Sequence, residues 1–130
     1  MTNSAVIDGN NFSNMSEFYD EVERKLTRDL NWKIGRNLDA FNDVLRGGFG
    51  IHEYGEELDL IWSNSEKSKL DLGYEETLKY VEAKLATCHP TNVPYVQKDL
   101  EDLKAGKGDL LFKIIIGIIK DHDNLRLRLE

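Results

Sequence analysis

Asp39 and Asp43 are the two residues of this chain whose type and spacing best suit them to act together. On a helix, residues four apart are neighbours on one face, and two like charges there destabilise an isolated helix by about 0.2–0.5 kcal/mol. An arginine or lysine of another molecule would relieve that repulsion. The pair therefore indicates a surface that binds a cationic group.

A purely structural interpretation explains one of these aspartates better than the other. Asp39 falls in the first turn of the expected helix, where the helix dipole stabilises an acid whatever its function. Asp43 falls toward the carboxyl end of the same helix, where a negative charge is unfavourable. Both interpretations stay open for Asp39, whereas Asp43 points more strongly to a function.

No pattern in the chain predicts catalysis. The sequence contains no G-x-S-x-G motif, no P-loop and no dinucleotide fingerprint. A hydrolase that uses Asp39 and Asp43 as a carboxylate pair is conceivable, but carboxylates four apart on a helix surface usually lack the surrounding cleft. We therefore expect a protein that is not an enzyme and that needs no cofactor.

The candidate metal ligands are a lone thiol and three scattered histidines: Cys88, His89, His52 and His122. Their spacing matches no zinc pattern, and a lone cysteine is usually a core residue, so no metal site is expected. A single cysteine cannot form an internal disulfide, which suits the reducing cytoplasm. We expect a cytoplasmic protein.

The charge of the chain excludes some partners and favours others. Asp and Glu number 24 against 17 Lys and Arg, a formal net charge of −7 that would repel the phosphates of a nucleic acid. Between Asn37 and Trp62 six acids stand against Arg46 alone, a local charge of −5. Three of these acids, Glu53, Glu56 and Glu57, would strengthen a field that steers in a basic partner.

No segment predicts a membrane role. The first ten residues have neither a basic region nor an apolar stretch, so no secretory signal is expected. The longest apolar run, Leu110–Ile119, is about half the length needed to cross a bilayer.

The first half of the chain predicts a strand, two helices and a second strand. Asn14 and Asn37 are suitable N-caps for the helices, and Glu17 stands three residues after Asn14 in capping-box spacing. The charged side of the first helix should face solvent, and Gly47-Gly48 should end the second. The expected apolar positions are Ala5-Val6-Ile7 in the first strand, Phe18, Val22, Leu26 and Leu30 in the first helix, Leu38, Phe41, Val44 and Leu45 in the second, and Leu58–Trp62 in the second strand.

The second half predicts a short helix, a helical hairpin, a buried segment and a last strand. Ser63 or Ser65 suits the cap of the short helix, and Pro90 separates the two helices of the hairpin. Asp109–His122 is ambiguous in period, but its length favours a helix with Asp109 as its N-cap. The expected apolar positions are Tyr74, Leu78, Val81 and Leu85, then Val96, Leu100 and Leu103, and finally Leu125, Leu127 and Leu129. This order predicts a parallel sheet with crossover helices in a single domain, residues 1–130.

The run Gly35-Arg36-Asn37-Leu38-Asp39-Ala40-Phe41-Asn42-Asp43-Val44-Leu45 resembles the signature helix of the barstar family, intracellular inhibitors of secreted ribonucleases. Ala5–Gly9 is similar to the first strand and turn of that family, Leu58–Trp62 to its second strand and Leu125–Glu130 to its last. The resemblance implies a barstar-like three-layer α/β fold, in which a small three-stranded parallel sheet is flanked by helices.

The resemblance also implies a binding site. The family plugs a ribonuclease active site with its second helix and the adjoining loop, where acids stand in for substrate phosphates. Asp43 matches the principal inhibitory aspartate, Asp39 the supporting one, and Asp109 an acid at the start of the last helix. Gly48 and Phe49 match a glycine and an aromatic residue in the loop after the second helix. The implied partner-binding residues are Lys33, Asp39, Asn42, Asp43, Gly48, Phe49 and Asp109.

The chain departs from the family prototype in two ways. A family tyrosine is replaced by Lys33 or Ile34, and the tryptophan before the principal aspartate is Asn42. Residues 74–107, approximately, are an insertion that resembles the helical hairpin of a longer bacterial branch.

Two functions follow from these observations. The first is an immunity-type inhibitor, monomeric when free, that blocks the basic active site of a ribonuclease or a related nuclease toxin. The alternative is a non-inhibitory scaffold or regulatory module that makes its protein contacts through the inserted hairpin.

Overall fold

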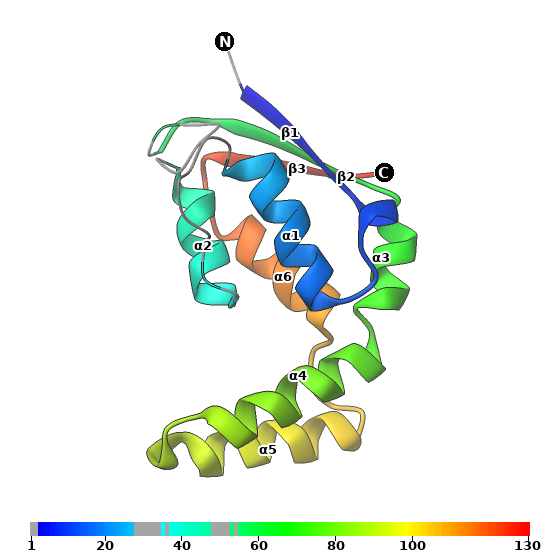
Figure 1. The fold of residues 1–130 in the computed structure, drawn as a ribbon, viewed down its shortest axis with the longest axis vertical. Helices are drawn as coiled ribbons and strands as arrows, with labels where there is room; N and C mark the ends of the chain where they lie inside the picture. Colours follow the sequence, from blue (N-terminus) through cyan, green and yellow to red (C-terminus); the bar gives the residue numbers. More distant parts are fainter. Residues whose placement is uncertain (1–2, 28–34, 36, 48–52, 54) are drawn as a thin grey trace.

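A computed structural model describes residues 3–27, 35, 37–47, 53 and 55–130, and these contain one three-stranded parallel sheet (Figure 1). Its strands are β1 (Asn3–Asp8), β2 (Leu58–Ser63) and β3 (Leu125–Leu129), in the spatial order β1-β2-β3. Ala5 is opposite Leu60, which is opposite Leu127. The α/β class and the parallel sheet are therefore confirmed.

Helices fill both connections between strands. One set of helices lies between β1 and β2 in the chain, and the other lies between β2 and β3. The second set includes a hairpin of α4 (Tyr74–Thr87) and α5 (Val93–Lys104), which projects away from the sheet in Figure 1. The helices are η1 (Gly9–Asn11), α1 (Met15–Leu26), α2 (Leu38–Arg46), α3 (Ser65–Asp71), α4 (Tyr74–Thr87), η2 (Pro90–Asn92), α5 (Val93–Lys104) and α6 (Leu111–Lys120).

One face of the sheet carries the core. Leu58, Leu60 and Trp62 of the central strand are each 0% exposed, and helices α1, α2 and α6 cover them. The helical layers are thus stacked on one face of the sheet. The opposite face is open to solvent: Val6 there is 39% exposed, and Arg126 bridges Glu57 at 2.7 Å and Asp59 at 3.2 Å.

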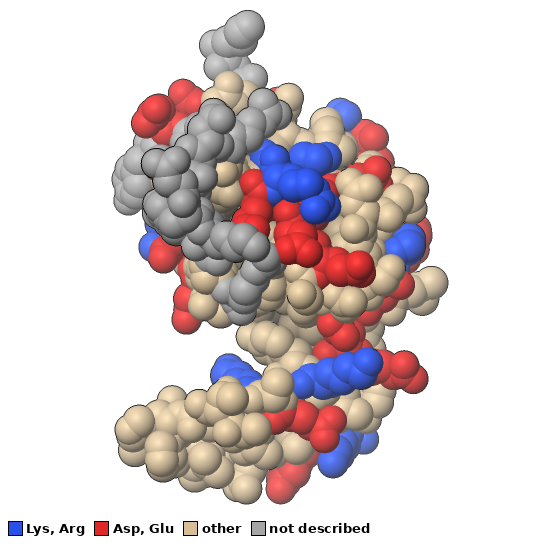
Figure 2. Space-filling view, in the orientation of Figure 1, with Lys and Arg blue, Asp and Glu red and all other residues tan. Residues whose placement is uncertain are grey.

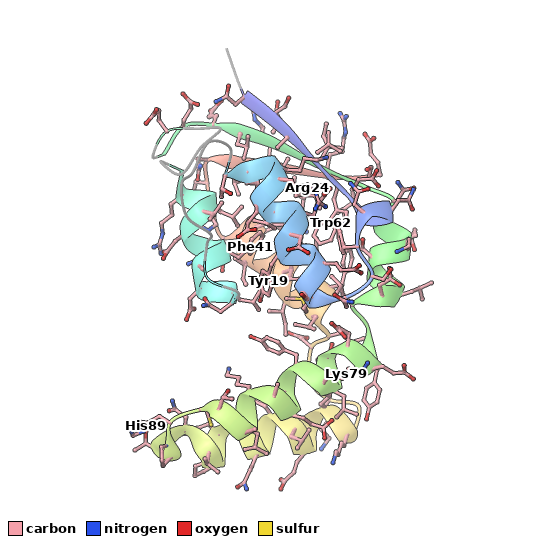
Figure 3. The ribbon with its side chains drawn as sticks, viewed as in Figure 1. Tyr19, Arg24, Phe41, Trp62, Lys79 and His89 are labelled. Atoms are coloured by element: carbon pink, nitrogen blue, oxygen red, sulfur yellow. The ribbon has the colours of Figure 1, made fainter. Side chains whose placement is uncertain are left out.

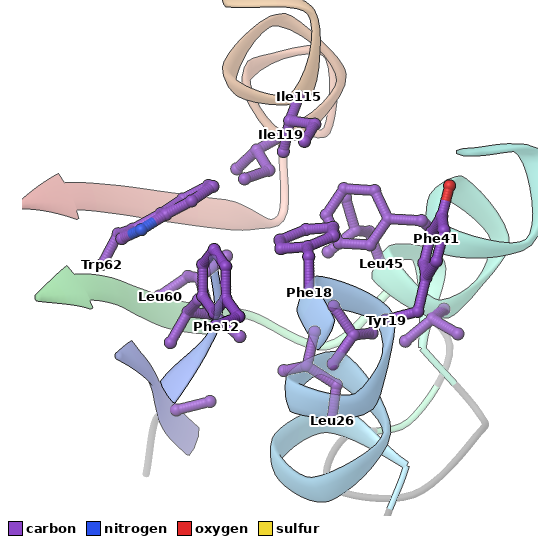
Figure 4. Packing of buried hydrophobic residues seen from close by; sticks show 14 of the residues in the cluster. Phe12, Phe18, Tyr19, Leu26, Phe41, Leu45, Leu60, Trp62, Ile115 and Ile119 are labelled. Atoms are coloured by element: carbon purple, nitrogen blue, oxygen red, sulfur yellow. The ribbon is translucent and has the colours of Figure 1, made fainter. Parts of the chain in front are cut away.

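An aromatic cluster centred on Phe18 of α1 joins the elements of the core (Figure 4). Its ring stacks on Trp62 of β2 with centroids 5.8 Å apart, and it meets the edges of Phe12 and Phe41 at 5.4 and 5.3 Å. Trp62 in turn contacts Phe112 of α6 at 5.2 Å. Such contacts add about 0.5–1.5 kcal/mol per pair to the gain from burial, so α1, α2, α6 and the sheet are packed as one unit.

The predicted caps of the first two helices are confirmed. The Asn14 side chain accepts a hydrogen bond from Glu17 N–H at 2.9 Å, and Asn37 accepts one from Ala40 N–H at 2.7 Å. Glu17 reaches back to the N–H of Ser13, one residue before the cap. Gly47 follows α2 with a φ of 96°, a conformation that favours glycine.

Two other predicted caps are wrong. Asn64, with a φ of 54°, precedes α3, and the Ser65 hydroxyl instead donates to the carbonyl of Glu130 at 2.9 Å. Leu110 rather than Asp109 precedes α6, because the first amides of α6 find partners outside the helix. The N–H of Leu111 donates to the Thr77 hydroxyl at 2.9 Å, and the N–H of Phe112 donates to the Leu72 carbonyl at 3.1 Å.

The root of the hairpin is therefore hydrogen-bonded to α6. Thr77 is 2% exposed, and its hydroxyl also donates to the Gly73 carbonyl. The predicted apolar stripe of α4 is only partly buried, since Tyr74 is 45% exposed and Thr77 is the residue that the helix buries. A two-helix hairpin that projects from the body offers too little surface to cover a whole stripe.

Glu21 of α1 is a buried acid, so the prediction that the charged residues of this helix face solvent is wrong at this position. Its side chain is 0% exposed. The carboxylate accepts hydrogen bonds from Asp8 N–H at 2.9 Å and from Asn11, and it pairs with Arg24 at 2.8 Å and Lys25 at 3.5 Å. Burial acts to raise the pKa of Glu21, but these donors outweigh it and hold the pKa below its ordinary value of 4.5.

We predict that Glu21→Gln lowers the free energy of unfolding by about 1–3 kcal/mol at pH 7, because a buried donor network loses its charged acceptor. The depressed pKa stabilises the fold above pH 4.5, and this contribution is lost as the pH falls through the folded-state value. The difference between the two proteins should therefore narrow on acidification. Urea titrations from pH 7 to pH 3 test this, with exposed Glu82→Gln as the control; a constant difference would contradict it.

We also predict that Thr77→Val destabilises the protein by about 1–3 kcal/mol, because valine keeps the shape but leaves the buried Leu111 N–H without its acceptor. Hydrogen exchange of the Leu111 amide should accelerate more than that of amides in β2. Thr87→Val is the matched control, since that hydroxyl bonds only the exposed Ala83 carbonyl. Equal effects of the two variants would show that the root contact is unimportant.

Candidate functional site

Helix α2 holds the predicted acidic pair on its outer side. Phe41, Val44 and Leu45 are buried against the core, with exposures of 2% or less. Asp39 and Asp43, on the remaining side of this helix, are both exposed. The packed face and the Asn37 cap fix the helix, so the two carboxylates are presented from a preformed element.

Asp43 already has a partner within the helix. Its carboxylate lies 2.8 Å from Arg46, and the two side chains are 57% and 51% exposed. An exposed pair of this kind contributes about 0–1 kcal/mol. Little free energy therefore opposes the exchange of Arg46 for a cation of another molecule.

Asn42 faces the body of the protein and contacts its C-terminal part. Asn42 Oδ1 lies 2.6 Å from Nε2 of His122, and since an amide oxygen only accepts, the contact is a hydrogen bond in the form of the ring that is protonated at Nε2. Burial lowers the pKa of His122 below its ordinary value of 6.5, the Arg46 charge lowers it further, and Asp121 opposes both. The contact joins α2 to the turn before β3.

Asp39 and Asp109 lie around one cavity of about 420 Å³ between α2 and the hairpin. A second cavity of about 450 Å³ extends it along α4 and shares Leu38, Asp39, Tyr80 and Lys84 with it. We call the two together the α2–hairpin groove. The first cavity is lined by Leu38, Asp39, Thr77, Tyr80, Val81, Lys84, Asp99, Asp102, Leu103, Gly108, Asp109 and Ile114.

The surroundings of Tyr80 in this groove shift the pKa of its hydroxyl. Burial raises the pKa of the Tyr80 hydroxyl above 10.0, and the charge of Asp39 raises it further. Asp39 therefore acts across the groove, from α2 onto α4.

The structure separates the predicted site residues into groups. Asp39 and Asp109 line the same groove, whereas Asp43 and Asn42 are outside its lining. Asp109 is exposed and pairs with Lys113 at 3.3 Å. The remaining predicted residues, Lys33, Gly48 and Phe49, lie outside the described residues.

The predicted acidic field is weaker than the sequence count implied. Arg126, from the end of the chain, pairs with two of the acids between Asn37 and Trp62, namely Glu57 and Asp59, and its single charge offsets one of their two negative charges. Glu56 accepts a hydrogen bond from Asn3, while Glu53 is exposed.

The candidate metal ligands are not brought together in the described part of the chain. His89 lies at the far end of the hairpin (Figure 3), whereas His122 contacts α2, and His52 is outside the described residues. Cys88 is not a core residue: it ends α4 half-buried, with its thiol 3.7 Å from the Leu85 carbonyl. Nor does any described helix combine the length and apolarity that a membrane crossing requires.

Sequence reasoning missed the groove residues of the hairpin. Tyr80 and Lys84 of α4, with Asp99 and Asp102 of α5, look like a solvated helix surface in the sequence. The one feature of the sequence that could have indicated this groove is the aromatic residue Tyr80, which lies outside the expected apolar stripe of α4. Its proximity to Asp39 depends on how the hairpin sits against α2.

Comparison with protein-family models matches residues 2–95 to a family described as Barstar (barnase inhibitor). The match covers more than half of the chain; it includes β1, α1, α2, β2, α3 and α4 and ends within α5. A search of curated proteins gives no match.

We predict that Arg46→Gln raises the pKa of His122, because one of the two groups that lower it is removed. Titration of the His122 ring followed by NMR measures the shift directly. Arg128→Gln, on the exposed face of the sheet, removes the same charge elsewhere and should leave the titration unchanged. A His122 pKa that falls in the Arg46 variant would contradict the assigned contact.

Proposed function

The chain belongs to the barstar family, and from that premise we propose that it is a protein inhibitor that blocks the basic active site of a ribonuclease or related nuclease toxin. The family is described by its inhibition of a ribonuclease, and its members are inhibitors, not enzymes. The observation that carries the proposal is the outward presentation of Asp39 and Asp43 on a capped, core-packed helix.

Electrostatics support this mode of action. A site that holds RNA presents arginines and lysines to the phosphates, and rigid carboxylates can form charge-assisted hydrogen bonds with those groups. Because the packing of Phe41, Val44 and Leu45 already orders α2, little conformational entropy is lost on binding. Inhibition then requires only that the helix occupies the cleft and excludes the substrate.

The proposed surface differs from that of the family prototype at Asn42, which replaces a tryptophan. Its amide oxygen is bound to His122 and its side chain is half-buried, so it is a supporting residue behind Asp43 more than an anchor. Anchor residues carry most of the energy of an interface. The target is therefore expected to differ from that of the family prototype, with charge pairs supplying a larger share of the affinity.

A second candidate function rests on the end of the hairpin. Residues 85–97 contain no charged side chain, although 32% of the chain is charged, and Tyr95 there is 72% exposed. Exposed tyrosines are common anchors at protein interfaces. This observation favours a scaffold or regulatory module that binds a protein through the hairpin, as the alternative to inhibition through α2.

We predict that Asp43→Ala weakens inhibition of the target ribonuclease at least about tenfold, as expected for loss of a charged anchor. The assay is hydrolysis of a fluorogenic RNA by a barnase-type ribonuclease and by nucleases encoded beside the gene of this protein. Alanine favours the helix, so circular dichroism should show an unchanged fold.

Glu66→Ala on α3 is the control for general charge effects, since that acid is exposed but lies outside the proposed surface. Tyr95→Ser separates the two candidate functions. If Asp43→Ala inhibits as well as the wild type and Tyr95→Ser abolishes binding of the partner, the scaffold function replaces the inhibitor function.

A further inference from the structure

The α2–hairpin groove is a second surface suited to a partner. In space-filling view, a hollow separates the body of the protein from the projecting hairpin (Figure 2). Its apolar lining is partly buried and comes from α2, α4 and α6, through Leu38, Val81 and Ile114, while Leu103 of α5 is buried beneath them. A volume of about 420 Å³ in the first cavity lies in the usual range for ligand sites.

The charges around the groove select a cation. Four carboxylates, Asp39, Asp99, Asp102 and Asp109, stand against Lys84 in its lining. Asp39 and Asp99 make no salt bridge with any residue in the described ranges.

The other two carboxylates are engaged only loosely. Asp102 is 3.4 Å from Lys98 and Asp109 is 3.3 Å from Lys113, and the side chains of these two pairs are 39–77% exposed. Exposed pairs of this kind contribute about 0–1 kcal/mol. A guanidinium or ammonium group of a ligand can therefore compete with both lysines.

The lining also suits the stem of a long basic side chain. Arginine and lysine place their methylene groups on apolar surface while the charged head stays near water or a carboxylate. Leu38, Val81 and Ile114 provide that surface, and the half-buried ring of Tyr80 provides a face on which a guanidinium can stack.

We propose that the α2–hairpin groove receives a protruding segment of a basic protein through an arginine or lysine side chain that pairs with Asp99 and Asp102. The proposal rests on the inhibitor function, because the occupant is the basic target that Asp43 would hold. Asp39 belongs both to the exposed acidic pair of α2 and to the groove, so the two surfaces are continuous. The hairpin then adds specificity for targets with a basic protrusion beside the active site.

The test needs no knowledge of the target. A capped tetra-arginine peptide is titrated into the ¹⁵N-labelled protein, and its affinity is measured by calorimetry. We expect amide shifts at Leu38, Val81 and Leu103. Asp99→Asn/Asp102→Asn should weaken binding at least about fivefold, as expected for the loss of two exposed charge contacts.

Glu82→Gln/Glu101→Gln is the matched control, because it changes the net charge equally on the same two-helix hairpin but outside the groove lining. It should bind the peptide as the wild type does. Equal weakening by both double variants, or shifts confined to residues outside the groove, would overturn the proposal. A capped tetraserine peptide should cause no shifts, and equal binding of it would overturn the requirement for a cation.

The inhibitor function is tested separately with Asp43→Ala, which lies outside the groove. Loss of ribonuclease inhibition with retained peptide binding supports both proposals. If Asp43→Ala retains both inhibition and peptide binding, Asp43 has no role in inhibition, and the assignment of the groove as a site for a basic side chain still stands. Lost peptide binding in Asp99→Asn/Asp102→Asn with unchanged inhibition of the ribonuclease would show that the target does not occupy the groove, and would overturn this inference alone.

Discussion

Strand order and the hand of the crossovers are the constraint on which the rest of this structure depends. The chain passes from β1 to β2 to β3 without reversing direction across the sheet. Parallel crossovers are right-handed in nearly all proteins, so two that step in the same direction must pass over the same face. The helices of both connections therefore gather on that face, and the opposite one faces water. Arg126, Glu57 and Asp59 make that side of a parallel sheet compatible with solvent.

A core on one side leaves the outer surfaces of its helices free for function. Phe18 lies at the centre, with contacts to β2 through Trp62 and to α2 through Phe41. The inner face of α2 is thus fully committed to packing, and its outer side can carry Asp39 and Asp43 without cost to the core. Stability and the proposed recognition are thus assigned to different faces of one nine-residue helix.

Local patterns in the sequence predicted the features that depend on local chemistry. The caps at Asn14 and Asn37, the glycine end of α2 and the alternation of Leu125 and Leu127 with Arg126 follow from residue type and spacing alone. Several of the features that were missed or mistaken depend on partners distant in the chain. Thr77 accepts a hydrogen bond from an amide 34 residues away, and Arg126 pairs with Glu57 and Asp59, which the sequence count had treated as free. The groove likewise requires α2, α4, α5 and α6 to meet, which no periodicity encodes.

The attachment of α4 to α6 makes the hairpin an integral part of the fold and not a detachable module. Thr77 and Leu72 accept the first two amide hydrogens of α6, so excising the hairpin at its base would expose the start of the helix that carries Ile115 and Ile119 into the core. A shortened hairpin, whether natural or engineered, must therefore keep the first turn of α4. Its outer end is therefore free to vary in length and composition, while its point of departure is fixed.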